Sequence, residues 1–292
     1  MPGKIAGMVD SKKNSDWTKI ELAAIVRSYL GMLALELAGQ RYNKTAFRDA
    51  LIKQINGSRS KGSIEFKHCN ISAVMQVLGY PSIQGYKPRN NFQNSLLDEV
   101  ATQLTSYPQL IAITESAVTQ PAHVINFHSF EHVQQEAPEK KHIVAEANVQ
   151  YGVRHPARRD YLAQEARNQS LGNAGEQFVV AYERWKLAQY GLHDLADRVE
   201  HVALTLGDGL GFDVRSFDQQ GHEQLIEVKT TSFSKETPFF VTHNELEVSK
   251  AEHDKYLLYR VYAFRKQPQF FALRGSIEQH CYLDPITYRA SF

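Results

Sequence analysis

The sequence predicts an α/β protein, in which a mostly helical N-terminal domain precedes a domain built on a mixed β-sheet. Residues 1–106 carry helix-start signals and apolar residues at helical spacing, while residues 158–292 alternate between helical and strand-like segments. The chain has 292 residues, of which 42% are hydrophobic, so it can bury a core in each domain. We therefore expect domains over 1–106 and 158–292, with a connector over 107–157.

The N-terminal domain begins with a clear helix signal. Thr18 and Glu21 have the spacing of a capping box in front of an apolar-rich helix over 20–37. A second helix is expected over 44–55, where the following Asn-Gly pair ends it. The first of these helices is apolar on most sides and should be largely buried.

The rest of this domain is expected to contain a loop and two more helices. Residues 57–63 are Gly, Ser, Arg and Lys, which predicts a flexible basic loop. Asn70 then has the position of an N-cap for a helix over 71–78, and a last helix is expected over 92–106.

The connector has a different character. Residues 107–157 contain four prolines, many His and Gln residues and little periodicity. One strand is expected inside it, from the apolar residues Val124, Ile125, Phe127 and Phe130. A helix over 157–170 should then lead into the C-terminal domain.

The C-terminal domain opens with an amphipathic helix, whose apolar face is predicted to contain Phe178, Val179, Tyr182 and Trp185. Glu176 falls in its first turn, where a carboxylate suits the helix macrodipole. The sequence leaves open whether Glu176 only serves the helix end or also faces a site. Glu183, seven residues on, is expected to be solvated or paired with a lysine.

Two short apolar strands follow, and each carries an acid. Asp213 lies on the first, and Glu227 lies on the second with Lys229 two residues later. Because side chains alternate faces along a strand, Glu227 and Lys229 should share one face, while Ile226 and Val228 face the core. Converging carboxylates can hold Mg²⁺ through oxygen ligands, and a nearby ammonium can orient a metal-bound water. The residues are suited to hydrolysis of a phosphodiester.

The order of Asp213 and Glu227-x-Lys229 resembles the core of the PD-(D/E)XK nucleases, although Phe212 stands where that core often has proline. The resemblance implies four catalytic residues. Asp213 and Glu227 would bind Mg²⁺ or Mn²⁺, Lys229 would position the attacking water, and Glu176 would assist the metal or the water. The alternative is that Glu227 and Lys229 belong to ordinary cross-strand ion pairs.

Residues 158–292 also resemble the C-terminal domain of the plant protein NO VEIN, a family with bacterial members that is similar to the PD-(D/E)XK nucleases. The resemblance implies a nuclease-like fold, which can host both active enzymes and members that only bind. The positions that carry it include Leu171-Gly172, Gly175-Glu176, Val199-Glu200-His201-Val202, Gly211-Phe212-Asp213-Val214, Ile226-Glu227-Val228-Lys229, Asn244-Glu245 and Tyr259-Arg260-Val261-Tyr262.

Residues 17–100 resemble the N-terminal segment of McrA-like HNH restriction endonucleases. The resemblance is carried by Leu35-Glu36-Leu37-Ala38-Gly39-Gln40, Tyr42-Asn43-Lys44, Gly62-Ser63-Ile64-Glu65-Phe66-Lys67-His68, Asn70-Ile71-Ser72-Ala73-Val74 and Gly85-Tyr86-Lys87-Pro88-Arg89. No HNH cassette follows it, so the resemblance implies a module for DNA recognition.

The charge distribution agrees with a DNA-binding front end. Residues 1–110 carry fourteen Lys and Arg against eight Asp and Glu, a net +6, and the whole chain is +1, so the remainder is −5. Basic side chains supply most non-specific affinity for DNA. The side chains expected to contact phosphates are Arg59, Lys61, Lys67, Lys87 and Arg89. A solvated charged face is the alternative for each of them.

These patterns predict a metal-dependent DNA endonuclease in restriction or anti-phage defence. The alternative is a catalytically inactive nuclease-fold protein that binds DNA or acts as an adaptor. Expected partners are DNA and other defence proteins, with a homodimer as one assembly. The sequence has no run of about eighteen apolar residues and no apolar leader, so we expect a cytoplasmic protein without a membrane partner.

Overall fold

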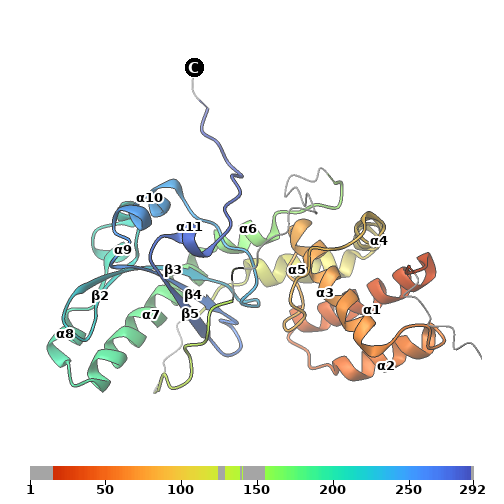
Figure 1. Ribbon diagram of the computed structural model, residues 1–292, viewed down its shortest axis with the longest axis horizontal. Helices are drawn as coiled ribbons and strands as arrows, with labels where there is room; N and C mark the ends of the chain where they lie inside the picture. The colour runs from red at the N-terminus through yellow and green to blue at the C-terminus, as the bar shows by residue number, and fades with distance from the viewer. Residues whose placement is uncertain (1–15, 124–128, 139, 141–154, 291–292) are drawn as a thin grey trace, which may run out of the picture.

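The computed structural model describes residues 16–123, 129–138, 140 and 155–290. A helical region and a sheet region lie side by side (Figure 1), which confirms the predicted α/β class with the helical part first. No helix in the described part of the chain is long and apolar enough to cross a membrane.

The helical region is built around its first helix. It contains α1 (Lys19–Leu37), α2 (Lys44–Gln54), α3 (Lys61–Val77), α4 (Asn94–Thr105) and α5 (Pro108–Thr119). α1 begins at the predicted capping box, in which Thr18 and Glu21 each bond the other's backbone amide. Its apolar side chains form the centre of a core to which all five helices contribute.

Two expectations for this region are wrong. α3 begins at Lys61 behind Ser60, whose hydroxyl accepts from the amide of Ser63, so residues 61–63 of the expected loop are helical. Asn70 therefore lies inside a helix and is 1% exposed. Its amide group donates to the carbonyl of Arg89 at 2.9 Å, so it fixes a distant turn instead of capping a helix. Both Ser60 and Asn70 have capping chemistry, and the tertiary packing decides between them.

The expected connector contains a helix that sequence analysis missed. Pro108 occupies the first position of α5, where its fixed φ is favourable, and Leu110 and Val118 are buried in the helical core. Residues 124–128 of the expected strand lie outside the described residues. Phe130 is not in a strand, and its ring packs against Phe178.

The sheet is mixed, as predicted. Its strands lie in the order β1 (Glu200–His201), β2 (Val214–Phe217), β3 (Glu223–Thr230), β4 (Tyr256–Tyr262) and β5 (Gln269–Arg274). All neighbouring pairs are antiparallel except β3 and β4, which run parallel. The parallel pair needs a crossover, and α10 (His243–Ala251) lies in it. The shorter elements are α8 (His193–Asp197), α9 (Val202–Thr205) and the 3-10 helix η1 (Asp208–Leu210).

Helices cover both faces of the sheet. α7 (Gln169–Gln189) packs against the face that contains Ile226 and Val228. Residues of α10 and of α11 (Ile277–His280) pack against the opposite face, which contains Leu258. Because β3 is covered on both faces, a charged residue on it is removed from water unless it lies at an opening.

The short helix α6 (Tyr161–Ala166) joins the two regions. Gly79 follows α3 and has φ +80°, and a Cβ there would lie 1.8 Å from the carbonyl oxygen of Arg159. Within α6, buried Glu165 accepts from the hydroxyl of Thr231 at 2.7 Å and from the amide of Ser232 at 2.9 Å. These two residues directly follow β3, so the end of that strand is bonded to the link between the regions.

Candidate active site

The structure brings the two predicted metal-binding acids together. β2 and β3 pair with Val214 opposite Ile226, and Asp213 directly precedes β2. The amide of Asp213 donates to the carbonyl of Ile226 at 2.9 Å, so Asp213 is bonded to the residue that precedes Glu227. The charge of Asp213 is also one of the causes that raise the pKa of Glu227. The side chains of Asp213 and Glu227 are thus neighbours.

Asp213 is a partly buried acid whose pKa is raised. Its Oδ2 accepts from the amide of Val228 at 2.7 Å. Burial, followed by the nearby Glu176 carboxylate, raises the pKa of Asp213 to about 7, although the bond from Val228 and the charge of Lys229 act in the opposite direction. Near neutral pH this carboxyl group is therefore divided between its protonated and ionised forms, and a bound cation would favour the ionised form.

Glu227 and Lys229 lie on the same face of β3, as predicted. Glu227 is 3% exposed. The Lys229 ammonium lies 2.7 Å from its Oε1 and 2.8 Å from Oε2 of Glu245. Ile226 and Val228 point to the opposite face and belong to the core beneath α7.

The electrostatics of this group follow from its composition, in which carboxylates outnumber the ammonium group. Burial raises the pKa of Glu227 well above its ordinary value. The charges of Asp213 and Glu245 raise it further, while Lys229 lowers it. Burial lowers the pKa of Lys229, but Glu227 and Glu245 raise it by more, so the net shift is upward. Lys229 is therefore charged and acts as a hydrogen-bond donor, and a further bound cation would favour the ionised forms of Asp213 and Glu227.

Glu245 is a site residue that sequence analysis missed. It is the third residue of α10, and its carboxylate accepts from the amide of Thr242 at 3.1 Å in a capping box. The same oxygen contacts Lys229. The signal was present as the spacing Thr242-x-x-Glu245, but a capping box by itself predicts only a helix start.

Glu176 is near this group but not where the sequence placed it. α7 begins at Gln169, so Glu176 is its eighth residue, and the expectation that it lies in the first turn is wrong. The macrodipole argument therefore does not apply. Oε2 of Glu176 lies 2.7 Å from Nε2 of His201, and its charge contributes to the raised pKa of Asp213.

A glycine brings α7 close to β3. A Cβ on Gly175 would lie 1.8 Å from Oγ1 of Thr230 on β3, so only glycine permits the observed approach. Glu176 is the next residue. The close packing of Gly175 against Thr230 thus sets how near the Glu176 carboxylate lies to β3.

Glu183 has a structural role. Its side chain is fully buried and accepts from the hydroxyls of Ser216 and of Tyr259, the latter at 2.9 Å. It also pairs with Lys186, which confirms one of the two expectations for this residue, while the expectation of a solvated side chain is wrong. Glu183 joins α7 to β2 and β4.

The site fits Mg²⁺ better than a metal that requires many protein ligands. Among the residues that the structure describes, no group of three or more His, Cys, Asp or Glu side chains is placed to hold a metal ion. Mg²⁺ is usually bound by one or two carboxylates and keeps several waters. Asp213 and Glu227 could supply these carboxylates, and burial is the main cause of the raised pKa of each.

The five predicted phosphate contacts divide into two groups. Arg59 is buried and donates to both carboxylate oxygens of Glu21 at 2.8 Å, and its guanidinium also lies over the ring of Trp17. Lys67 is buried over the same ring, and burial lowers its pKa. In this arrangement both side chains support the fold of the helical region, and their burial argues against direct contact with phosphates.

The other three residues face solvent. Lys61 begins α3, and Lys87 and Arg89 lie in the segment between α3 and α4. The Arg89 guanidinium lies 4.9 Å from the ring centre of Phe66 on α3. These side chains are free to approach a ligand, and their role as phosphate contacts stays a prediction.

Comparison with known proteins shows a family match in the sheet region. Residues 175–273 match the family model described as Protein NO VEIN, C-terminal, a PD-(D/E)XK nuclease-like family. The matched segment contains all four predicted catalytic residues. It does not reach the helical region, so the resemblance of that region to McrA-like HNH endonucleases stays a prediction. No curated protein and no solved structure matches the chain.

Proposed function

We propose that the protein is a metal-dependent DNA endonuclease that hydrolyses phosphodiester bonds in restriction or anti-phage defence. The observation that carries the proposal is the position of Asp213, which is bonded to both neighbours of Glu227, together with Lys229 on the same face of β3 as Glu227. All three lie within the segment that matches a nuclease-like family. Held by Asp213 and Glu227, Mg²⁺ or Mn²⁺ would supply Lewis-acid polarisation of the phosphate and activation of water.

The protein's own residues have distinct roles in this proposal. An ammonium group has three donors, and two of those of Lys229 are used by Glu227 and Glu245, which leaves one for the attacking water or a phosphate oxygen. Its raised pKa excludes Lys229 as a general base at neutral pH. Glu176 is oriented by His201 and assists from the side of Asp213.

A second candidate function is a nuclease-fold protein that binds DNA, or acts as an adaptor, without cutting. The ion pairs of Lys229 with two carboxylates favour this interpretation, because they also describe a purely structural network. This candidate predicts DNA binding with a steep salt dependence and no product that depends on Mg²⁺.

Substitution of Lys229 distinguishes the two. In Lys229→Ala we expect cleavage to fall by about 100-fold or more, as is usual when a single donor to the transition state is removed. DNA affinity should be kept. The matched control is Lys250→Ala, because Lys250 also pairs with two glutamates, Glu247 and Glu278, but lies on the exposed side of α10. Cleavage that is equal in Lys229→Ala and the control would contradict the assignment.

A further inference from the structure

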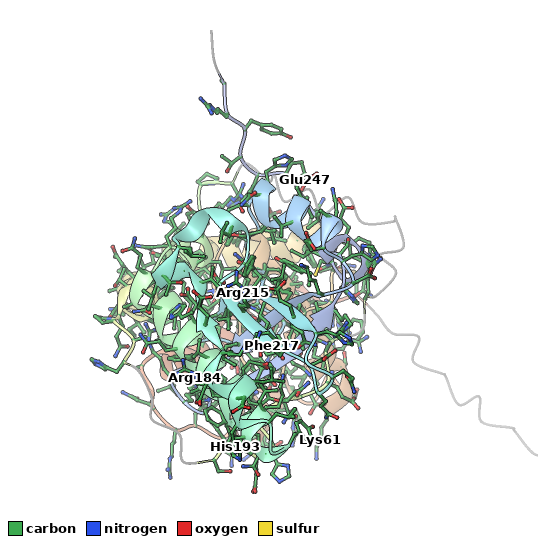
Figure 2. All side chains as sticks on the ribbon, turned by 90° about the vertical axis from the view of Figure 1, so that its left-hand side faces the viewer. Lys61, Arg184, His193, Arg215, Phe217 and Glu247 are labelled. Carbon is green, nitrogen blue, oxygen red and sulfur yellow. The ribbon has the colours of Figure 1, made fainter. Side chains whose placement is uncertain are left out.

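An open cleft lies beside the proposed active site, at the edge of the sheet. It has a volume of about 540 Å³ and is lined by residues of α7, α9, β2 and the segment around β1. Three arginines, Arg184, Arg198 and Arg215, line it together with the carboxylates of Asp197 and Glu200. Figure 2 shows Arg184, Arg215 and Phe217 on the side of the molecule that carries this cleft.

The arginines are not equivalent. Arg215 lies 2.7 Å from a Glu200 oxygen and 3.1 Å from a Glu223 oxygen, so its charge is already compensated. Arg184 and Arg198 have no carboxylate within 4 Å among the described residues. Asp197 offsets part of their charge without pairing with either.

Neutral groups hold both of these guanidinium groups in place. Arg184 donates to the carbonyl of Val199 at 3.0 Å. The Arg198 guanidinium lies 4.4 Å from the ring centre of Phe217, which is a cation–π contact. An arginine fixed in this way keeps its charge available and loses less conformational entropy when it binds a phosphate. The cleft thus presents two pre-oriented positive charges.

The rim of the cleft also offers an apolar contact. Leu204 on α9 lines the cleft and is 67% exposed. Two available guanidinium groups beside an exposed apolar side chain suit a nucleotide, which has both an anionic group and an apolar base.

His201 connects the cleft to the proposed active site. Its side chain lines the cleft, and its Nε2 bonds Glu176. In the sheet His201 stands opposite Val214, the neighbour of Asp213, and the amide of Val202 donates to the Asp213 carbonyl at 2.8 Å. His201 and Val202 thus connect the lining of the cleft to Glu176 and Asp213.

We propose that this cleft binds the DNA strand that flanks the scissile phosphate, with Arg184 and Arg198 as its phosphate contacts. The inference rests on the proposed function for its choice of ligand. It adds a second binding surface on the sheet region, separate from the exposed lysines and arginine near α3.

The test is DNA binding by charge-removal variants. A short fluorescein-labelled duplex is titrated with the full-length protein over a range of salt concentrations, with Ca²⁺ in place of Mg²⁺ so that the DNA is not consumed. The variants are Arg184→Gln, Arg198→Gln and the double variant. The matched control is Arg167→Gln, an exposed arginine that pairs only with Asp160 among described residues.

We expect the double variant to bind about tenfold more weakly, with a salt slope smaller by about 0.9 for each phosphate that is no longer neutralised. Arg167→Gln should bind as the wild type does. If Arg184→Gln fails to fold because its bond to Val199 is removed, Arg198→Gln alone still tests the proposal, since it breaks no backbone hydrogen bond.

Equal affinity and slope in the double variant and the control would overturn the inference, as would a wild type that binds no DNA. The result is distinguishable from the fate of the proposed function. A wild type that binds through Arg184 and Arg198 but never cuts would retain the cleft and reject the nuclease. If the wild type cuts DNA and neither DNA affinity nor cleavage changes in the Arg184 and Arg198 variants, the nuclease proposal is retained and the cleft proposal is rejected.

Discussion

Asp213 is hydrogen-bonded to both neighbours of Glu227. Its amide donates to the carbonyl of Ile226 at 2.9 Å, and its carboxylate accepts from the amide of Val228 at 2.7 Å. These two bonds hold the partly buried Asp213 next to the buried Glu227. Such a pair is unfavourable without added positive charge, and the pKa values of both acids are raised. The pair should therefore respond to neutral substitution, to pH and to a bound cation.

Replacing one of these acids by its neutral amide should stabilise the metal-free protein. The pKa of Asp213 is about 7 in the folded protein against an ordinary 3.8, so the folded state binds this proton more tightly. The free energy of unfolding therefore falls as pH rises between about 4 and 7. Since one pKa unit corresponds to about 1.36 kcal/mol, we expect Asp213→Asn to be more stable by on the order of 2 kcal/mol at about pH 8.

Denaturant unfolding in EDTA at mildly acidic and at alkaline pH measures this effect. Near pH 4, where the Asp213 carboxyl is protonated, the two proteins should unfold alike. Asp160→Asn is the control, because Asp160 is exposed and pairs only with Arg167 in the described part of the chain. Equal stability of Asp213→Asn and wild type at alkaline pH would show that the ionised Asp213 carboxylate does not destabilise the folded protein.

Cation binding should be coupled to release of a proton. A metal ion that binds Asp213 must displace its proton whenever the pH lies below the pKa of about 7. We expect the affinity for Mg²⁺ or Mn²⁺ to rise with pH by about tenfold per pH unit for each proton displaced, and Glu227, whose pKa is also raised, adds to the dependence. Titration calorimetry in buffers with different ionisation enthalpies would detect the released proton. An affinity independent of pH would place the metal elsewhere.

The close approach of α7 to β3 predicts a contrast between two glycines of the same helix. A Cβ on Gly175 would overlap the Thr230 side chain at 1.8 Å, whereas the nearest atom to a Cβ on Gly172 is 3.7 Å away. We expect Gly175→Ala to lose about 1–3 kcal/mol of stability by overpacking and Gly172→Ala to lose none. Thermal unfolding of the two variants compares them directly. Equal unfolding temperatures would mean that the helix does not pack on the strand at Gly175.

The link between the two regions predicts a large effect at Glu165. Its carboxylate is the acceptor for the Thr231 hydroxyl and the Ser232 amide, and it lies near the buried Arg260. In Glu165→Ala these groups lose their partner in a buried setting, so we expect a loss of about 2–4 kcal/mol in the free energy of unfolding. The exposed Glu115→Ala is the control. A small loss, as in the control, would show that water replaces the carboxylate.

Local patterns predicted much of the fold and part of the site. The spacing of Glu227 and Lys229 on a strand placed both on one face, and the Thr18–Glu21 pair marked the start of α1. These features depend on residues close in sequence, where strand alternation and capping geometry are fixed by the backbone. The mixed sheet followed from the order of its segments.

Other features depended on contacts between distant residues. The local sequence around Arg59 predicts a surface charge in a basic loop. The structure instead buries Arg59 in a hydrogen bond to Glu21, which lies 38 positions earlier in the chain. Glu245 is part of the site because the first turn of α10 lies next to Lys229 on β3. The start of α7 was misplaced because Asn168 caps it, with its side chain accepting from the amide of Leu171. Periodicity carries no information about such long-range partners.

Cleavage of plasmid DNA and of modified phage DNA in the presence of Mg²⁺ or Mn²⁺, by wild type beside Asp213→Ala, tests the central claim most directly. The account predicts products with the wild type and either cation, none with EDTA, and none with Asp213→Ala. Equal cleavage by both proteins would place the chemistry away from the Asp213–Glu227 pair. No cleavage by the wild type of any of these substrates would contradict the nuclease and favour the DNA-binding or adaptor protein.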